Sequence, residues 1–388
     1  MKRDKFNFFV LLFCSIASVA SFSAAFAASA VSAEVVEAGK LGAGIDLING
    51  EAKNVCIEIN KQELIGRGIN ESYYYQMMDI VDYGQLASML NISAIDNLKI
   101  GIAQNYSEID LSQKERRFNE VKIGGDFKYF MIHMSAMAPW NAVMDAQIKE
   151  EYLGLLTKGP DGVKAFREKC GDEYVVQNRT GMSLSYLIEV SMTNSEDKSY
   201  FEKNIRPKMQ QGKDVSSIRA MLKELSMEKN VRVLTFLDGD FIDSQDANKY
   251  IDELDRFQGY IHNLATTKND VGDYGVLNDS LTHKYLFLDN FPMGVDLVKT
   301  HDEVFMMGIL SRDRDEMLKD VSRAEALLKK SVTLEQRAEI ESIYNQDKIN
   351  LKIIAKRAQE CFADLKKCQY PEESDGYKKK RLPLYLEF

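Results

Sequence analysis

The chain has 388 residues and a formal net charge of −9 at pH 7. This length is enough for one large domain or for two of ordinary size. An acidic surface argues against nucleic acid as a partner and against simple electrostatic adsorption to anionic lipid. After the first residues, no apolar run approaches the ~18 residues that a membrane-spanning helix needs. The composition therefore favours a globular protein that is soluble when made.

Residues 1–27 have the pattern of a secretory signal peptide. Basic residues precede an apolar run that starts at Phe8, and the small residues Ala25 and Ala27 offer a cleavage site. Equally permissible sites follow as far as Ala33. We therefore expect a secreted or periplasmic protein whose mature chain begins after a cleavage within residues 27–33.

Four cysteines remain after this processing, namely Cys56, Cys170, Cys361 and Cys368. In an oxidising compartment they suggest two disulfides, with three possible connectivities. A helix through both Cys361 and Cys368 would hold their Cα atoms ~10.5 Å apart, beyond the ~7 Å limit for a bridge. Either the helix ends near Leu365 and the chain curls back, or each of these cysteines pairs elsewhere. We favour Cys361 with Cys368 and Cys56 with Cys170.

Alternating apolar residues and turn signals divide the first half of the chain into predicted elements. After a glycine-rich opening these are, in chain order, a strand at 54–60, a helix at 72–90, a strand at 98–102, a charged insertion at about 104–120, a strand at 127–135 and helices at 137–157 and 160–169. Two strands thus bracket a charged insertion.

The stretch from residue 166 to residue 192 joins a turn to the clearest period-two segment of the chain. Cys170, Gly171 and Asp172 predict a turn that closes the preceding helix. Gly181 marks a place where the chain must bend or where another backbone approaches closely. From Leu184 onward apolar residues occupy alternate positions, which predicts a long strand with one dry face.

The second half of the chain is mostly helical. The predicted elements are a charged helical excursion at about 194–230, a strand at 231–236, a helix at 246–265, a strand at 284–288 and helices from residue 302 to about 365, split near Ser331. Thr333 and Gln336 form a capping box for the last helix. The remaining residues, 366–388, form a tail.

Signatures of catalysis and of metal binding are lacking. The four histidines have no metal-ligand spacing, and neither HExxH nor GxSxG occurs. Asp238, Asp240 and Asp243 begin like a calcium loop, but Asp243 stands where that loop needs glycine. We therefore expect no enzymatic activity, no cofactor and no metal site. An enzyme with an unrecognised site remains as a third hypothesis beside the two that are given at the end of this subsection.

The order of the elements resembles that of the membrane attack complex/perforin superfamily, which is related in fold to the cholesterol-dependent cytolysins. Gly171, Tyr174 and Gly181 fall on the family's signature, and residues 41–51 look like its glycine-rich opening. The chain departs from the signature at Cys170, which replaces an aromatic residue. It also departs at 172–173, which replace Thr-His, and after Gly181, where a glycine pair is common.

The resemblance implies an α+β fold with a bent, twisted four-stranded antiparallel sheet, two flanking helical clusters at about 104–120 and 194–230, and a C-terminal helical segment. Residues 28–365 would form this domain. Gly171, Tyr174 and Gly181 would shape the turn beneath the bent sheet, and Gly239 would end the fourth strand. Lytic members of the family oligomerise and refold such clusters into membrane-spanning hairpins. Membrane lipid, further copies of the chain and a protein receptor are the partners that this implies.

The charge of the clusters weighs against membrane insertion. In the stretch 200–210 Lys203 lies on one alternating face and Arg206 on the other, and a basic residue facing lipid at mid-bilayer costs ~2–4 kcal/mol. Two hypotheses follow. The first is a secreted perforin-like protein that acts by binding and oligomeric assembly, with pore formation as the mechanism implied by the family. The second is a non-lytic secreted or periplasmic adhesion or structural protein of the same fold.

Overall fold

The computed structural model describes residues 40–383 except 49, 66–72, 107–108, 211–214, 238–239, 243–246, 267–276 and 298. The expected signal peptide at residues 1–27 and its cleavage site lie outside the described residues, and so does Gly239, which was expected to end the fourth strand.

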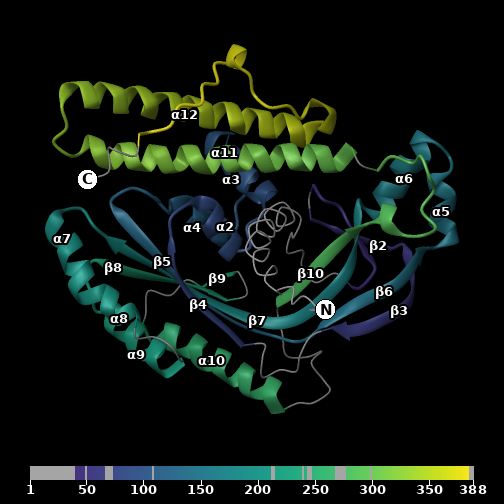
Figure 1. Cartoon of the computed structure of the whole chain (residues 1–388), viewed down its shortest axis with the longest axis horizontal. Coiled ribbons are helices and arrows are strands. Elements are labelled where there is room, and N and C mark those ends of the chain that lie inside the picture. Colours follow the sequence, from purple (N-terminus) through teal and green to yellow (C-terminus); the bar gives the residue numbers. More distant parts are fainter. Residues whose placement is uncertain are drawn as a thin grey trace, which may run out of the picture.

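One antiparallel sheet organises the chain, and four long strands run through it (Figure 1). Three of the long strands consist of two segments each, and the third is continuous. The segments are β3 (Ile57–Ile65) and β4 (Tyr73–Ile80) in the first long strand, β5 (Phe127–Met137) and β6 (Trp140–Ile148) in the second, β7 (Glu173–Ser191) in the third, and β8 (Val231–Leu237) and β10 (Leu277–Lys284) in the fourth. In one half β4, β5, β7 and β8 are neighbours, and in the other β3, β6, β7 and β10. The expected bent, four-stranded antiparallel sheet is confirmed.

Three short strands extend this sheet at its margins. β1 (Ala43–Ile45) pairs with β2 (Ala52–Val55) and with the first residues of β7. β9 (Asp240–Ile242) forms a hairpin with β8. Among the strands that the structure describes, β7 alone runs without a break from one end of the sheet to the other, and it pairs with strands of both halves.

The two faces of β7 are both buried, which corrects the expectation of a single dry face. Leu184, Tyr186 and Ile188 belong to one hydrophobic core, whereas Leu187 belongs to a second core on the opposite face. The intervening Ser185 is also buried. Both faces are covered because a helical cluster packs against each of them. The serines that alternate with apolar residues in β7 suggested a solvent-exposed face, so the sequence did not show that helices cover this face too.

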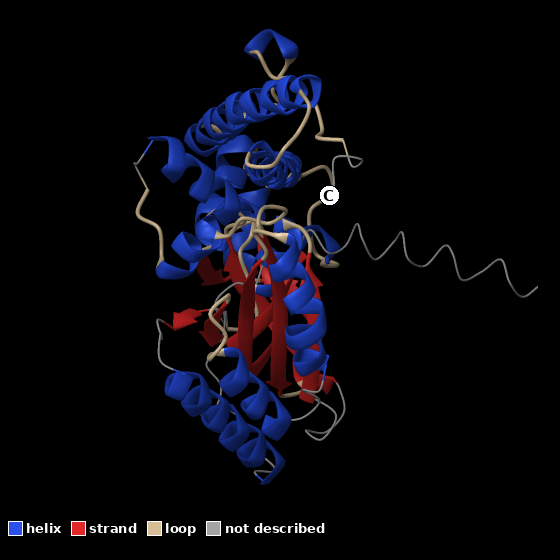
Figure 2. Cartoon of the chain, turned by 90° about the vertical axis from the view of Figure 1, so that its left-hand side faces the viewer, coloured by secondary structure: helices blue, strands red, loops and turns tan. Residues whose placement is uncertain are grey.

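Two helical clusters cover the sheet (Figures 1 and 2). The first cluster links β4 to β5 and consists of α2 (Tyr83–Met89), α3 (Ala94–Tyr106) and α4 (Gln113–Glu120). The second links β7 to β8 and consists of α7 (Ser195–Tyr200), the π-helix η2 (Phe201–Ile205), α8 (Arg206–Gln210) and α9 (Val215–Leu225). It lies beside α10 (Ala247–Thr266), a helix inserted between β8 and β10.

Three elements of the first half differ from the sequence prediction. Residues 73–80 form strand β4, where a helix was expected, and residues 140–148 form strand β6. Residues 98–102, expected as a strand, lie inside helix α3. Ile95, Leu98 and Ile102 are its buried residues at helical spacing, and a short apolar alternation is compatible with either period. The first cluster therefore begins at Tyr83 rather than near residue 104.

Two long helices and a tail complete the chain. α11 (Lys299–Leu328) and α12 (Leu334–Ala363) form a helical pair above the first cluster (Figure 1). Thr333 caps α12 as expected, because its hydroxyl accepts from Gln336 N at 3.2 Å and Gln336 Oε1 accepts from Thr333 N at 3.0 Å. The tail, with the short turns η4 (Leu365–Lys367) and η5 (Glu373–Asp375), folds back along the pair.

Two further helices connect the second strand to the third. They are α5 (Glu150–Leu156) and α6 (Pro160–Cys170). Pro160 occupies the first turn of α6, where its missing N–H has no intrahelical partner to lose, and Gly171 ends the helix. α6 thereby delivers the chain to the start of β7.

Candidate functional site

The two disulfides join Cys56 with Cys170 and Cys361 with Cys368, the pairing favoured from the sequence. The Cα atoms of the first pair are 5.7 Å apart, and those of the second 4.3 Å. The second bridge can form because α12 ends at Ala363 and the chain then turns back. The first bridge ties the start of strand β3 to the end of α6, at the end of the sheet opposite the two clusters.

Gly171 stands where only glycine fits. Its φ is +75°, and a Cβ atom there would lie 2.4 Å from the carbonyl oxygen of Ile45. The approach is mutual, since a Cβ on Gly44 would lie 1.7 Å from the carbonyl oxygen of Cys170. Asp172 N donates to Ile45 O at 2.7 Å across the same contact. The turn therefore locks β1 onto the start of β7.

Substitution of Gly171 by alanine is expected to lower the free energy of unfolding by about 3 kcal/mol, from left-handed strain and displacement of the Ile45 carbonyl. Gly159→Ala is the matched control. Gly159 has φ +77°, but no atom lies within 4 Å of the point that a Cβ would occupy there, so only the strain of about 1 kcal/mol applies. Urea unfolding of both variants measures the difference, and equal losses would contradict the close approach.

Asp172 and Tyr174 complete this corner. The buried Asp172 carboxylate accepts from Arg167 Nε at 2.7 Å and from Leu47 N at 3.1 Å. Tyr174 packs against Tyr285 with ring centroids 5.3 Å apart, and burial raises the pKa of its phenol to about 12. Four of the predicted residues thus lie together and stabilise the corner where α6, β1 and β7 meet, namely Cys170, Gly171, Asp172 and Tyr174.

Gly181 lies apart from that corner, near the middle of β7. It pairs with Met137, the last residue of β5, and with Leu277, the first of β10. A Cβ on Gly181 would lie 2.9 Å from the carbonyl oxygen of Ala136. Both neighbouring strands are interrupted within a few residues of this point, whereas β7 continues through it. The expected location of the bend therefore coincides with breaks in the second and fourth strands.

The two clusters leave the sheet at the same end. Ile80, the last residue of β4, pairs with Tyr129 of β5. At the same level Phe127 pairs with Ser191, and Val190 with Val231. Each cluster therefore stands where a simple hairpin turn would otherwise connect two paired strands.

The second cluster is attached to the sheet by apolar side chains. Phe201, Ile205 and Met209 are buried at helical spacing, and residues of α9 join them in the same core. Phe201 stacks on Phe130 of β5 with centroids 5.2 Å apart. At the rim Lys128 Nζ lies 3.8 Å from Glu202 Oε1. The charges of this cluster that obstruct a lipid-facing strand are turned outward in the helical state.

The first cluster is attached differently, because its central helix α3 packs against α11 and α12. Asn97 of α3 is buried and donates to Ser311 Oγ and Asp315 Oδ1, both at 2.8 Å. Arg314 lies fully buried above Gly101, where a Cβ would come within 2.8 Å of its Nε. Burial raises the pKa of Asp315 to about 6 and lowers that of Arg314 to about 10. A polar, desolvated interface thus joins the first cluster to the C-terminal pair.

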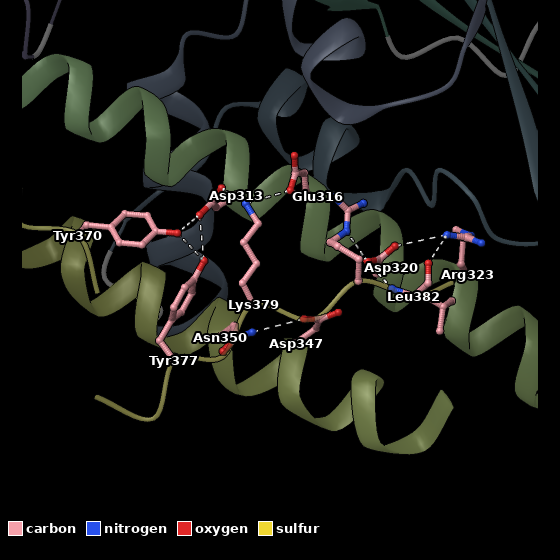
Figure 3. A network of polar contacts seen from close by, with 11 residues as sticks. Asp313, Glu316, Asp320, Arg323, Asp347, Asn350, Tyr370, Tyr377, Lys379 and Leu382 are labelled. Atoms are coloured by element: carbon pink, nitrogen blue, oxygen red, sulfur yellow. Dashed lines mark hydrogen bonds and ion pairs between the residues drawn. The ribbon is translucent and has the colours of Figure 1, made fainter. Parts of the chain in front are cut away.

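The tail binds the outer side of that pair (Figure 3). Asp313 of α11 accepts from the hydroxyl of Tyr377 at 2.9 Å and from Lys379 Nζ at 2.8 Å. Arg381 Nε donates to Asp320 Oδ2 at 2.7 Å. On α12, Asn350 Nδ2 donates to the carbonyl oxygen of Lys378 at 2.8 Å. The basic run of the tail therefore neutralises an acidic stripe on α11.

Asp347 of α12 faces this network while fully buried. Burial, together with the nearby charge of Asp320, raises the pKa of its carboxyl to about 7. A raised native pKa stabilises the fold at acidic pH, and this contribution is lost as the pH rises through the native pKa. Asp347 therefore opposes folding once it ionises.

Asp347→Asn is expected to weaken the pH dependence of stability. Between pH 5 and pH 8 the wild-type chain should lose about 2 kcal/mol more unfolding free energy than the variant, since only the wild type must ionise the buried carboxyl of Asp347. Urea unfolding at both pH values checks this, with the exposed Asp145→Asn as the control that should behave as wild type. The same pH dependence of stability in all three proteins would refute the raised pKa of Asp347.

Comparisons with known proteins do not identify a family for this chain. No protein-family model matches the chain, and no curated protein matches it. Among solved structures, that of stonustoxin is similar over 87% of this chain and 42% of its own, with a TM-score of 0.37 and 10% sequence identity. The chain thus spans less than half the length of that protein. The bent antiparallel sheet of four long strands and the two inserted clusters described above are the features that the resemblance to the membrane attack complex/perforin superfamily implies.

Proposed function

We propose that this is a secreted perforin-like protein that acts by binding and oligomeric assembly rather than by catalysis, and that it forms pores in a target membrane by refolding its two clusters into β-hairpins. One observation carries the proposal. Both clusters interrupt hairpins of a single sheet, and they do so at the same end. Extension of the two hairpins would therefore continue four neighbouring strands in one direction.

The clusters have enough chain for this change. A spanning β-strand needs ~9–11 residues, so a hairpin needs roughly twice that number and a turn. The first insertion runs from Val81 to Asp126 and the second from Met192 to Asn230, and both exceed the requirement. None of the helices in the described part of the chain has the length and low charge of a membrane-spanning helix, so these insertions are the segments to consider.

Assembly is supported by the edge of the sheet. Within the described residues, β3 pairs with β6 alone and β4 with β5 alone, so the first strand has one open side. An open edge presents unpaired N–H and C=O groups to a strand of another chain. On the opposite side of the half formed by β4, β5, β7 and β8, the short strand β9 pairs with the last three residues of β8, so the two edges of that half differ. Unlike edges favour head-to-tail contacts, which close into rings when the rotation permits.

The non-lytic adhesion or structural protein is the second candidate, and the charge of the clusters favours it. Lys203 and Arg206 would place basic groups on both faces of a strand, as would Lys114 and Arg117 in the first cluster. In that case the clusters stay helical and the open edge alone binds a partner.

Vesicle permeabilisation by mature protein, residues 28–388, tests the proposal. Vesicles of several lipid compositions, loaded with a quenched dye, should lose it on addition of the protein, and electron microscopy should show ring- or arc-shaped oligomers on the same vesicles. Monomers that leave every composition intact would rule out pore formation and leave the non-lytic candidate.

A further inference from the structure

The segment Tyr370–Pro383, here called the strap, crosses both C-terminal helices. On α11 it contacts Asp313, Glu316 and Asp320 through its basic residues and tyrosines. On α12, Arg357 Nη2 lies 2.7 Å from Asp375 of the strap. The buried Leu382 joins an apolar cluster to which both helices contribute. The strap therefore contacts both helices and thereby helps to hold them together.

Helix α3 of the first cluster depends on these same two helices. Its apolar face, with Ile95, Leu98 and Ile102, is buried by residues of α11 and α12 rather than by the sheet. Tyr377 of the strap closes the same cluster of side chains. If α11 and α12 separate, α3 consequently loses the core partners of this face and keeps only the contact of Ile100 with the core against the sheet.

Charge makes the strap essential to the pair. Asp320 and Asp347 are buried where α11 and α12 meet, and Asp313 is buried on the outer side of α11. Lys379 and Arg381 are the strap's counterions for this acidic stripe. Without them Asp313 loses its lysine partner, and among the cations that the structure describes Asp320 keeps only Arg323 of its own helix, at 3.5 Å. The site then holds less compensated negative charge with little water, which favours separation of the helices or entry of water.

We propose that the strap is a releasable latch: while it is bound, it holds α11 and α12 on α3 and keeps the first cluster helical, and when it leaves, that cluster is free to refold. Two features suit the strap to release. It is held by side-chain contacts and single backbone hydrogen bonds, and the side chains of Lys379 and Arg381 remain 40% and 46% exposed. The chain joins the strap to α12 through residues 364–369, and the Cys361–Cys368 bridge holds the start of this link at the helix end, so the latch can rebind. The role of the latch in controlling pore formation rests on the proposed function, whereas its stabilisation of α3 does not.

Hydrogen exchange measured by mass spectrometry tests the latch on the mature protein. Lys379→Glu with Arg381→Glu should accelerate exchange in α3 by about tenfold or more, because local opening of the pair exposes it. Lys378→Glu with Lys380→Glu, two exposed neighbours with the same change of charge, should leave α3 within about twofold of wild type. Exchange in the second cluster, α7–α9, should stay unchanged in both. Unchanged protection of α3 in the first variant would overturn the latch.

Tyr377→Phe decides the question if the double variant does not fold. It removes one hydroxyl from Asp313 and keeps the ring packing, so a smaller but selective acceleration in α3 is expected. No acceleration in α3, or equal acceleration in α7–α9, would overturn the latch. Dye release by the same proteins separates this inference from the proposed function. Selective acceleration in α3 without release by any form would support the latch and count against pore formation.

Discussion

Removal of the Cys56–Cys170 bridge, as Cys56→Ala with Cys170→Ala, is expected to lower the free energy of unfolding by about 5 kcal/mol. The bridge closes a loop of 114 residues, and the entropy that a cross-link removes from the unfolded chain grows with the logarithm of loop length. Both cysteines are fully buried at the corner where β3, α6 and β7 meet. Chemical unfolding of the oxidised wild type and of the variant gives the difference.

The second bridge provides the matched control for this prediction. Cys361 and Cys368 are separated by only 7 residues, so the same argument gives a loss of about 2.5 kcal/mol for Cys361→Ala with Cys368→Ala. A larger loss for the short loop than for the long one would show that unfolded-chain entropy does not set the contribution of these bridges.

Phe201→Ala is expected to detach the second cluster from the sheet at a cost of about 3–5 kcal/mol. Phe201 is fully buried and stacks on Phe130, and it lies in the π-helical turn through which the cluster first contacts the sheet. Exchange in α7–α9 should accelerate by about a hundredfold or more, while amides of β10 and α12 keep their protection. If the clusters refold, the variant should also permeabilise vesicles faster than wild type.

Lys203→Ala is the control for Phe201→Ala, since Lys203 is an exposed residue of the same turn. It should change stability by less than about 0.5 kcal/mol and leave exchange in α7–α9 as it is. An equal acceleration of exchange throughout the chain in Phe201→Ala would show that the cluster does not open separately from the rest of the fold.

Local patterns in the sequence predicted the parts of the fold that depend on neighbouring residues. The turn at Gly171 requires a left-handed backbone that glycine adopts readily, and the alternation from Leu184 onward identified β7. The capping box at Thr333 marked the start of α12. The second cluster was expected at about 194–230 and occupies residues 195–225.

Contacts between distant segments set the parts that the sequence did not reveal. β8 and β10 pair with the same strand although α10 separates them along the chain, and no local pattern states that pairing. The aromatic run at the start of β4 suits a helix face and a strand equally until β5 lies beside it.

The polar interface of α3 with α11 was missed for a different reason. α11 carries charged residues on nearly all of its surface, so its periodicity does not show that Arg314 and Asp315 point inward. The one available signal was Gly101, a glycine inside a helix that leaves room for the Arg314 side chain.

A reversible cross-link between the second cluster and the sheet tests the central claim most directly. Lys128 of β5 and Glu202 of η2 lie within ion-pair distance at 3.8 Å, so Lys128→Cys with Glu202→Cys can be bridged by a short bis-methanethiosulfonate reagent, which forms a reducible disulfide with each cysteine and releases methanesulfinate. The four native cysteines of residues 28–388 are already paired. Each single-cysteine variant, treated with the same reagent and reductant, is the control.

The bridged protein is expected to bind vesicles without releasing their dye and to regain release when mild reduction opens the bridge, while both single-cysteine controls release dye throughout. Release by the bridged form at the rate of the controls would contradict refolding of the second cluster, and release by none of the proteins would contradict pore formation.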